Sequence, residues 1–254
     1  MNDMVTAGLA TLRTTAPGGL VPRVLAELDL IDRYTRVDGP IGPMFVAFNR
    51  RGISAVVPLA DEAAFRSHYE ERVGGDVVKG ELPTLLARRL RKAVETGRLG
   101  DLPVDLGALT EFQQAVLRKT AEIPAGQVRP YGWVAREIGK PGAVRAVGSA
   151  LNKNPVPVVI PCHRVSRGDG TIGEYAFGEA MKRKLLESEG LEPGYEELAH
   201  QGVRFVGSDT TKIYCFPTCR HARRVMSRHE VRFPSRETAE AAGYRGCKVC
   251  RPAA

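Results

Sequence analysis

The chain has 254 residues, 43% of them hydrophobic, and a formal net charge of +8, which favours a nucleic acid as its partner. No apolar run approaches the roughly 20 residues of a membrane span, so we expect no membrane association. The N-terminus lacks a basic segment followed by an apolar core, so we expect no secretory leader and a reducing, cytoplasmic location, where cysteines serve chemistry or metal binding.

The first half of the chain predicts a hairpin followed by two helices. Residues 42–58 contain two β-rich runs on either side of Asn49-Arg50-Arg51-Gly52, a loop in which positive φ angles are favourable. Residues 61–73 and 81–97 have apolar residues at helical spacings of three and four. The periodicity then ends in the Gly-, Pro- and Asp-rich segment 95–107, which we interpret as a linker.

Helical periodicity returns at Thr110, which forms a capping-box pattern with Gln113 at the start of a helix. Two short helical stretches follow, over residues 133–138 and 143–152, with the turn Gly-Lys-Pro-Gly between them. Two short helices across a glycine-containing turn are compatible with a DNA-binding helix-turn-helix, although helix pairs are also common in other proteins.

Cys162 lies in a proline-rich run. It is isolated from the other four cysteines, which all follow residue 214. Residues 154–165 should be extended since their prolines forbid a helix, and residues 177–189 should form the next amphipathic helix. His163 and Arg164 could lower the pKa of the thiol and activate it. A single buried cysteine is equally often a small hydrophobic side chain, so these residues alone leave both interpretations open.

The surrounding motif resembles the O6-alkylguanine-DNA alkyltransferases, suicide repair proteins that accept an alkyl group from damaged guanine. The matching residues are Pro161-Cys162-His163-Arg164-Val165, Asn154-Pro155, Arg145-Ala146-Val147-Gly148 and Tyr175. The resemblance covers residues 109–190 strongly and 35–100 more loosely. It implies an α/β (α+β) fold with a ribonuclease-H-like N-terminal domain and a helical, winged helix-turn-helix-like alkyltransferase domain, and alkylated double-stranded DNA as the partner.

The resemblance also implies a role for each residue of the reaction. Cys162 would accept the alkyl group in one irreversible displacement, and His163 would take the thiol proton through a water. Glu189 would orient that histidine. Tyr175 would donate a proton toward the leaving guanine, and Asn154 would brace the active-site turn.

The family must also expose its target base. A base inside a duplex cannot be reached, so the damaged nucleotide is flipped into a pocket. By resemblance, Arg145 would fill the vacated stack and Tyr131 would rotate the neighbouring phosphate. Further DNA contacts are expected from Ala146, Gly148 and Arg164.

The tail of the chain is basic and rich in cysteine. From His200 onward there are eleven Lys or Arg and four Asp or Glu, and four of the five cysteines. Cys215, Cys219, Cys247 and Cys250 form a C-x₃-C and a C-x₂-C pair, the spacing of a tetrahedral zinc site, with disulfides as the alternative. We therefore expect one zinc ion, no organic cofactor, and a small module that needs the metal to fold.

Residues 210–252 resemble the zinc-binding domain of the Ada adaptive-response protein. The shared features are C-x-P-[ST]-C, an arginine-rich stretch, the sequences RF and AAGYR, and a closing C-K-x-C. The resemblance implies that Cys215, besides binding metal, is a second acceptor that takes methyl from DNA phosphotriesters. A zinc module that only clamps DNA is the alternative.

These observations predict three domains in a monomer, over residues 1–103, 109–191 and 203–254. The function expected is direct-reversal DNA repair, with single-turnover transfer of the alkyl group from O6-alkylguanine to Cys162. The alternative is an alkylation-damage sensor that binds DNA without reacting, and the intact Cys162 argues against it. A Cys-His hydrolase would need an oxyanion hole, for which the sequence gives no indication.

Overall fold

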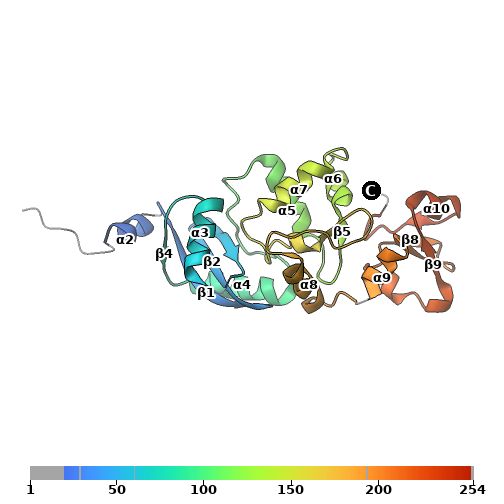
Figure 1. Cartoon of the computed structure of the whole chain (residues 1–254), viewed down its shortest axis with the longest axis horizontal. Coiled ribbons are helices and arrows are strands. Elements are labelled where there is room, and N and C mark those ends of the chain that lie inside the picture. The colour runs from blue at the N-terminus through green and yellow to red at the C-terminus, as the bar shows by residue number, and fades with distance from the viewer. Residues whose placement is uncertain (1–19, 29, 60, 193, 253–254) are drawn as a thin grey trace, which may run out of the picture.

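The structure is a computed structural model that describes residues 20–28, 30–59, 61–192 and 194–252. Over these residues the chain has the mixed α/β fold that we expected, with the ends that carry α2 and α10 at opposite extremes (Figure 1). The expectation of no secretory leader concerns residues 1–19, which lie outside the described part. None of the described helices combines the length and apolarity that crossing a membrane requires.

The N-terminal part is a four-stranded sheet in the order β3-β2-β1-β4, in which β1 is antiparallel to β2 and parallel to β4. Its strands are β1 (Asp32–Gly39), β2 (Gly42–Asn49), β3 (Gly52–Val57) and β4 (Val77–Lys79). Its helices are α2 (Leu20–Glu27), α3 (Glu62–Arg72) and α4 (Thr84–Thr96). Because side chains alternate along β2, Phe45 packs with Phe65 of α3, whereas Val46 belongs to the cluster that holds Leu90 of α4. Helices therefore cover both faces of the sheet.

The predicted hairpin and both predicted helices of this part are confirmed. Gly52 ends the hairpin loop with φ +133°, and a Cβ there would lie 2.3 Å from the carbonyl oxygen of Pro103, so the position requires glycine. The expected linker is wrong for its second half. Ile53 donates to Pro103 and Asp105 donates to Ile53, which fastens the segment to β3.

The central part consists mainly of helices. They are α5 (Glu111–Ala121), α6 (Tyr131–Glu137), α7 (Val144–Asn152), α8 (Glu179–Ser188) and the 3₁₀ helix η1 (Cys162–Arg164), with the short parallel strands β5 (Arg129–Pro130) and β6 (Val165–Ser166). The capping box at the start of α5 is confirmed. Gln113 N donates to Thr110 Oγ1 over 3.3 Å, and Thr110 N donates to Gln113 Oε1 over 3.0 Å.

The expectation that residues 154–165 are extended is wrong. The segment is a series of turns that ends in η1, and Val158 has φ 74°. Proline excludes an α-helix, but it fits tight turns equally well, so the prolines did not distinguish a turn from a strand.

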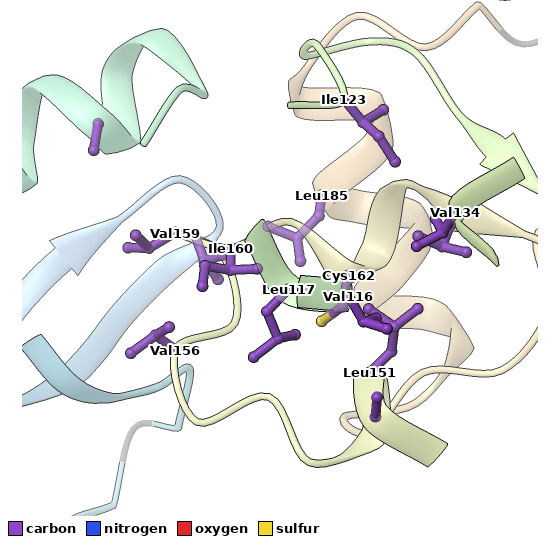
Figure 2. Close-up of a cluster of buried hydrophobic side chains, with 14 of the residues drawn as sticks. Val116, Leu117, Ile123, Val134, Leu151, Val156, Val159, Ile160, Cys162 and Leu185 are labelled. Atoms are coloured by element: carbon purple, nitrogen blue, oxygen red, sulfur yellow. The ribbon is translucent and has the colours of Figure 1, made fainter. Parts of the chain in front are cut away.

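The C-terminal part is a small sheet in the order β10-β8-β7-β9. Its elements are α9 (Gly194–His200), β7 (Phe205–Ser208), β8 (Ile213–Cys215), η2 (Ala222–Arg224), η3 (Ser227–His229), β9 (Glu230–Phe233), α10 (Arg236–Ala241) and β10 (Arg245–Gly246). One hydrophobic cluster joins all three parts, from Ile53 in the first sheet through Leu117 and Cys162 to Cys219 in the tail. Figure 2 shows the middle of this cluster.

Candidate active site and metal centre

Cys162 begins η1 with 9% of its surface exposed, and it lies among Val116, Leu117 and Leu151 (Figure 2). Burial raises the pKa of its thiol, while a hydrogen bond from Asn154 and the positive charge of Lys182 oppose that rise. The resting side chain is therefore a protonated thiol. It needs a base before it can act as a nucleophile.

Asn154 holds the turn that presents this cysteine. Its Nδ2 atom donates to the carbonyl oxygen of Ile160 over 2.9 Å and to Cys162 Sγ over 3.3 Å, and its Oδ1 accepts from Val156 N over 3.1 Å. Val56 of β3 also donates to the carbonyl oxygen of Pro155. The bracing geometry expected of Asn154 is present, and the N-terminal sheet supports the same turn.

His163 is fully buried and points its Nε2 atom at Glu189 Oε1, 2.8 Å away. Burial lowers the pKa of His163, although the carboxylate of Glu189 opposes this, so the ring is neutral. The carboxylate can only accept a hydrogen bond, so the neutral ring carries its proton at Nε2 and leaves Nδ1 as the nitrogen that accepts. Nδ1 is buried and has no hydrogen-bonding partner among the described residues. The ring is therefore arranged to take a proton at Nδ1.

Arg164, contrary to expectation, offers no surface for a DNA contact, because its side chain is completely buried. Its Nε and Nη2 atoms donate to Glu189 over 2.8 and 2.7 Å, and Nη1 donates to the carbonyl oxygens of Gly97 and Ile123. Burial would raise the pKa of Glu189, but the hydrogen bonds from His163 and Arg164 lower it to about 2. Arg164 therefore keeps the carboxylate ionised and fixed behind His163.

Tyr175 supplies a buried hydroxyl group beside His163. Its ring meets that of His163 edge-on, with the centroids 6.3 Å apart. Burial raises its pKa well above the usual value, and the nearby Cys162 raises it further. The hydroxyl makes no hydrogen bond of standard geometry within the described part of the chain. Tyr175 thus presents a protonated donor at the thiol.

Lys182 is a residue of the site that the sequence interpretation missed. It is 1% exposed, and its Nζ donates to the carbonyl oxygens of Val165, at 2.6 Å, and Glu174, at 3.3 Å. Burial lowers its pKa to about 8, and Cys162 opposes that shift. Its position on α8 could have revealed it, since Lys182 shares the i, i+3, i+4, i+7 face with Leu185, Leu186 and Glu189.

The remaining expected DNA contacts lie on one surface. Tyr131 begins α6, and Arg145 and Ala146 are exposed in the first turn of α7. A Cβ on Gly148 would lie 3.8 Å from the ring of Tyr131, so these residues of the two helices are neighbours. Among the described residues, Arg145 has no side-chain hydrogen bond or ion pair. Its guanidinium is therefore available to a ligand.

A cleft of about 620 Å³ opens beside this surface, between the central part and the tail. Tyr131 and Val144 line its central side, and Ser235 and Pro234 line its tail side. Four arginines also line it, from both sides: Arg136, Arg167, Arg204 and Arg236. Partial burial lowers the pKa of Arg136, and the positive charge of Arg236 lowers it further. Glu237 also lines the tail side, where two arginines outnumber it, so the walls of the cleft carry net positive charge on both sides.

The four cysteines of the tail come together as predicted. Cys215, Cys219, Cys247 and Cys250 are buried, unpaired by disulfides, and their sulfur atoms all lie within 4.8 Å of one another. A tetrahedral site with Zn–S bonds of about 2.3 Å needs sulfurs about 3.8 Å apart, so the cluster fits zinc. Pairing of β10 with β8 brings the two pairs together. Cys215 and Cys247 also line a hollow of about 450 Å³ with His221, Arg224, Arg245 and Lys248.

Two family models match the chain. The model described as 6-O-methylguanine DNA methyltransferase, DNA binding domain, matches residues 111–191, which include Cys162 and Glu189. The model described as the metal binding domain of Ada matches residues 197–253, which include all four cysteines of the cluster. The tail is thus an Ada-type zinc-binding domain.

Individual relatives agree with these matches. The chain is 36% identical to the bifunctional transcriptional activator/DNA repair enzyme Ada of Escherichia coli K12 over 63% of its own length, but it spans only 46% of that relative. It resembles the crystal structure of Mycobacterium tuberculosis OGT in complex with DNA with a TM-score of 0.50 and 34% identity, over 62% of this chain and 92% of that one. The methylated-DNA–protein-cysteine methyltransferase of Methanosarcina barkeri is 35% identical over 61% of this chain and 96% of that relative. The chain therefore belongs to the methylated-DNA–protein-cysteine methyltransferase family.

Proposed function

We propose that this protein repairs alkylated DNA by direct reversal, with Cys162 as the acceptor of one alkyl group from O6-alkylguanine. The observation that carries the proposal is the arrangement around Cys162: a buried thiol held by Asn154, a neutral His163 fixed by Glu189, and the buried hydroxyl of Tyr175. It supplies a nucleophile, a base and an acid in one place.

The reaction follows from these protonation states. The sulfur of Cys162 attacks the alkyl carbon, so an S–C bond forms as the C–O bond to guanine breaks. The thiol proton passes to Nδ1 of His163, Tyr175 gives its hydroxyl proton to the departing guanine, and the proton on His163 then returns to the tyrosinate, so that one proton moves in total from the thiol to guanine. The resulting thioether is not hydrolysed, so each molecule acts once.

We infer that the target nucleotide is flipped out of a duplex that lies across α6 and α7. Arg145 would occupy the vacated stack, Tyr131 would turn the adjacent phosphate, and Ala146 and Gly148 would allow a close approach of the backbone. The exposure and proximity of these residues support the inference. The arginine-lined cleft beside Tyr131 would receive the sugar-phosphate backbone as it runs toward the tail.

We assign three domains, over residues 1–103, 109–191 and 203–254, in a protein that acts as a monomer, because one chain contains every residue of the site. The sheet with helices on both faces supports a ribonuclease-H-like first domain. The pair α6 and α7, with β5 and β6 beside it, supports a winged helix-turn-helix in the second.

A second activity at Cys215 is favoured by the hollow that it lines with five basic or imidazole side chains, which suit the phosphates that flank a phosphotriester and the phosphodiester anion that leaves. The sulfur of Cys215 would attack the methyl carbon, and a DNA phosphodiester would leave. Bound zinc keeps such a thiolate deprotonated. A tail that only clamps DNA predicts no such reaction.

Peptide mapping by mass spectrometry tests both proposals. The zinc-loaded protein is mixed with one DNA that contains O6-methylguanine and, separately, with one that contains methyl phosphotriesters. Methyl on Cys162 from the first DNA supports guanine repair, and methyl on Cys215 from the second supports the added activity. If DNA binds and neither cysteine is labelled, the protein is a damage sensor. Cys162→Ser should bind DNA and accept nothing from the first DNA.

A further inference from the structure

Arg129 of β5 is a buried arginine for which the described residues provide no carboxylate. It is 3% exposed, and its guanidinium donates to two neutral acceptors, the carbonyl oxygen of Val128 at 2.8 Å and Gln127 Oε1 at 2.6 Å. A buried charge is costly unless an opposite charge compensates it. The negative charge that stabilises Arg129 must therefore come from another kind of group.

The cysteine cluster of the tail is the candidate, because the Arg129 guanidinium lies 5.1 Å from the ring centroid of Phe216, the residue that follows Cys215. Burial lowers the pKa of Arg129, and charge on Cys250, Cys219, Cys215 and Cys247 opposes this, in that order. Four thiolates around one divalent zinc leave an excess of negative charge on the centre. A nearby cation reduces the cost of that excess.

Contacts on both sides of Arg129 fix it between the two domains. Its guanidinium lies 5.9 Å from the ring centroid of Trp133 on α6 and 5.1 Å from that of Phe216, which follows Cys215. Trp133 Nε1 donates to the carbonyl oxygen of the ligand Cys250 over 3.1 Å. Val128 N donates to Oγ1 of Thr218, which precedes the ligand Cys219, over 3.0 Å.

We propose that Arg129 is the counter-charge of the zinc centre, so that the alkyltransferase domain completes the metal site of the fused tail. Binding of zinc then holds residues 128–133 in place, and Tyr131 lies within that segment. Metal loading of one domain thereby positions a DNA-contacting residue of the other. This inference goes beyond the repair reactions and does not depend on either of them.

Trp133 is the single tryptophan of the chain, so its fluorescence reports on this interface alone. Removal of zinc from the wild-type protein with a chelator should shift its emission to longer wavelength, as the indole loses Cys250 and meets water. Added zinc should restore the emission. Emission that is unchanged after complete metal removal would overturn the coupling.

The charge itself is tested by Arg129→Met, which keeps much of the bulk, and Arg129→Lys, which keeps the charge. Zinc release to a chromogenic chelator should be at least about 10-fold faster for Arg129→Met, the lower end of what loss of a supporting group costs a metal site, and intermediate for Arg129→Lys. Arg118→Met on α5, an exposed arginine that bonds to Gln114, is the matched control and should release zinc at the wild-type rate.

The possible results separate clearly. If folded Arg129→Met retains zinc as long as the wild type, the guanidinium serves packing and the proposal is wrong. If Arg129→Met does not fold, the Arg129→Lys rate decides, because release less than about 10-fold faster than wild type supports the charge and release at least about 10-fold faster contradicts it. Neither readout involves DNA. A failure of guanine repair would appear separately, as missing methyl on wild-type Cys162.

Discussion

Glu189 is a mostly buried carboxylate that accepts hydrogen bonds from two fully buried side chains, His163 and Arg164. Its pKa is about 2 in the folded protein against 4.5 for an unperturbed glutamate. The stabilisation that this carboxylate provides is therefore complete above about pH 4.5 and is lost as the pH falls toward 2. The lowering of the Glu189 pKa corresponds to a stabilisation of the folded protein of roughly 3 kcal/mol.

We predict that Glu189→Gln lowers the free energy of unfolding at pH 7 by roughly 3 kcal/mol, because a neutral amide leaves Arg164 buried without a counter-charge. The difference from wild type should shrink as the pH falls from 4.5 to 2. Urea unfolding over this pH range measures it. Glu187→Gln, an exposed change on the same helix, is the control. A difference that does not vary with pH would contradict the role of the ionised carboxylate.

Lys182 contributes a positive charge that acts on the Cys162 thiol. Lys182→Met removes a charge that lowers the pKa of the Cys162 thiol, so that pKa should rise further. We predict transfer to Cys162 at least about 10-fold slower at pH 7, with the rate recovering at higher pH as more thiolate forms. Single-turnover rates between pH 6 and 9 measure this. A uniform loss at every pH would instead indicate a structural role, and Lys184→Met, exposed on the same helix, should change nothing.

The role of a site residue could be predicted from the sequence where a motif defines it. It could not be predicted where the role depends on whether the side chain is buried. Cys162, Asn154 and Glu189 were chosen from the motif, and the structure brings them together. Arg164 belongs to the same motif, from which we predict that it faces DNA, whereas the structure buries it. Its burial depends on Glu189 and on two carbonyl oxygens distant in the sequence, which no local pattern reveals.

At the scale of elements, the turn that contains Cys162 is held by the side chain of Asn154 and by one backbone bond from β3. We predict that Asn154→Ala slows transfer to Cys162 by about 10- to 100-fold, because a misplaced reacting atom costs rate steeply. The variant leaves Val156 N without its acceptor and removes one of two donors to the carbonyl oxygen of Ile160, which keeps its bond from Cys162 N. Single-turnover transfer at saturating DNA measures the effect. Asn152→Ala, exposed at the end of α7, should react at the wild-type rate, and equal losses in both variants would refute the bracing role.

Elements set by local contacts were predicted well, and those set by distant contacts were not. The hairpin over β2 and β3 depends on the positive φ of Gly52, and the start of α5 depends on the pair Thr110 and Gln113, and both features act within a few residues. The short strand β4 was missed because only its pairing with β1 makes it a strand. The turns over residues 154–165 are held by Asn154 and by a bond from β3, so prolines alone could not specify them.

At the scale of the molecule, the spacing of the four tail cysteines predicted a metal-binding module, but not where that module packs against the rest of the chain. The position of the tail depends on the contacts of Trp133 and Thr218 across the junction, which have no local pattern. That position creates the cleft between α6 and α10 and places Arg136 close to Arg236. Like charges repel across a junction, so an anion in the cleft would relieve the repulsion.

If DNA phosphate enters the cleft, the affinity for DNA should depend on salt through the arginines that line it. Each phosphate contact makes the logarithm of the DNA binding constant fall with the logarithm of salt concentration by about 0.9. We predict that Arg136→Gln reduces the magnitude of this slope by about 1 and weakens binding regardless of sequence. Fluorescence anisotropy of labelled duplexes between 50 and 200 mM salt, the range over which phosphate contacts change affinity most visibly, measures it.

The control for this experiment is Arg91→Gln, which removes an exposed arginine from α4, in the N-terminal part far from the cleft (Figure 1). Arg91→Gln lowers the net charge equally, so a general charge effect would change both slopes alike. A slope reduced only in Arg136→Gln places a phosphate in the cleft. An unchanged slope in Arg136→Gln, with methyl still transferred to Cys162, means that DNA crosses α6 and α7 without entering the cleft and that the tail holds DNA elsewhere or not at all.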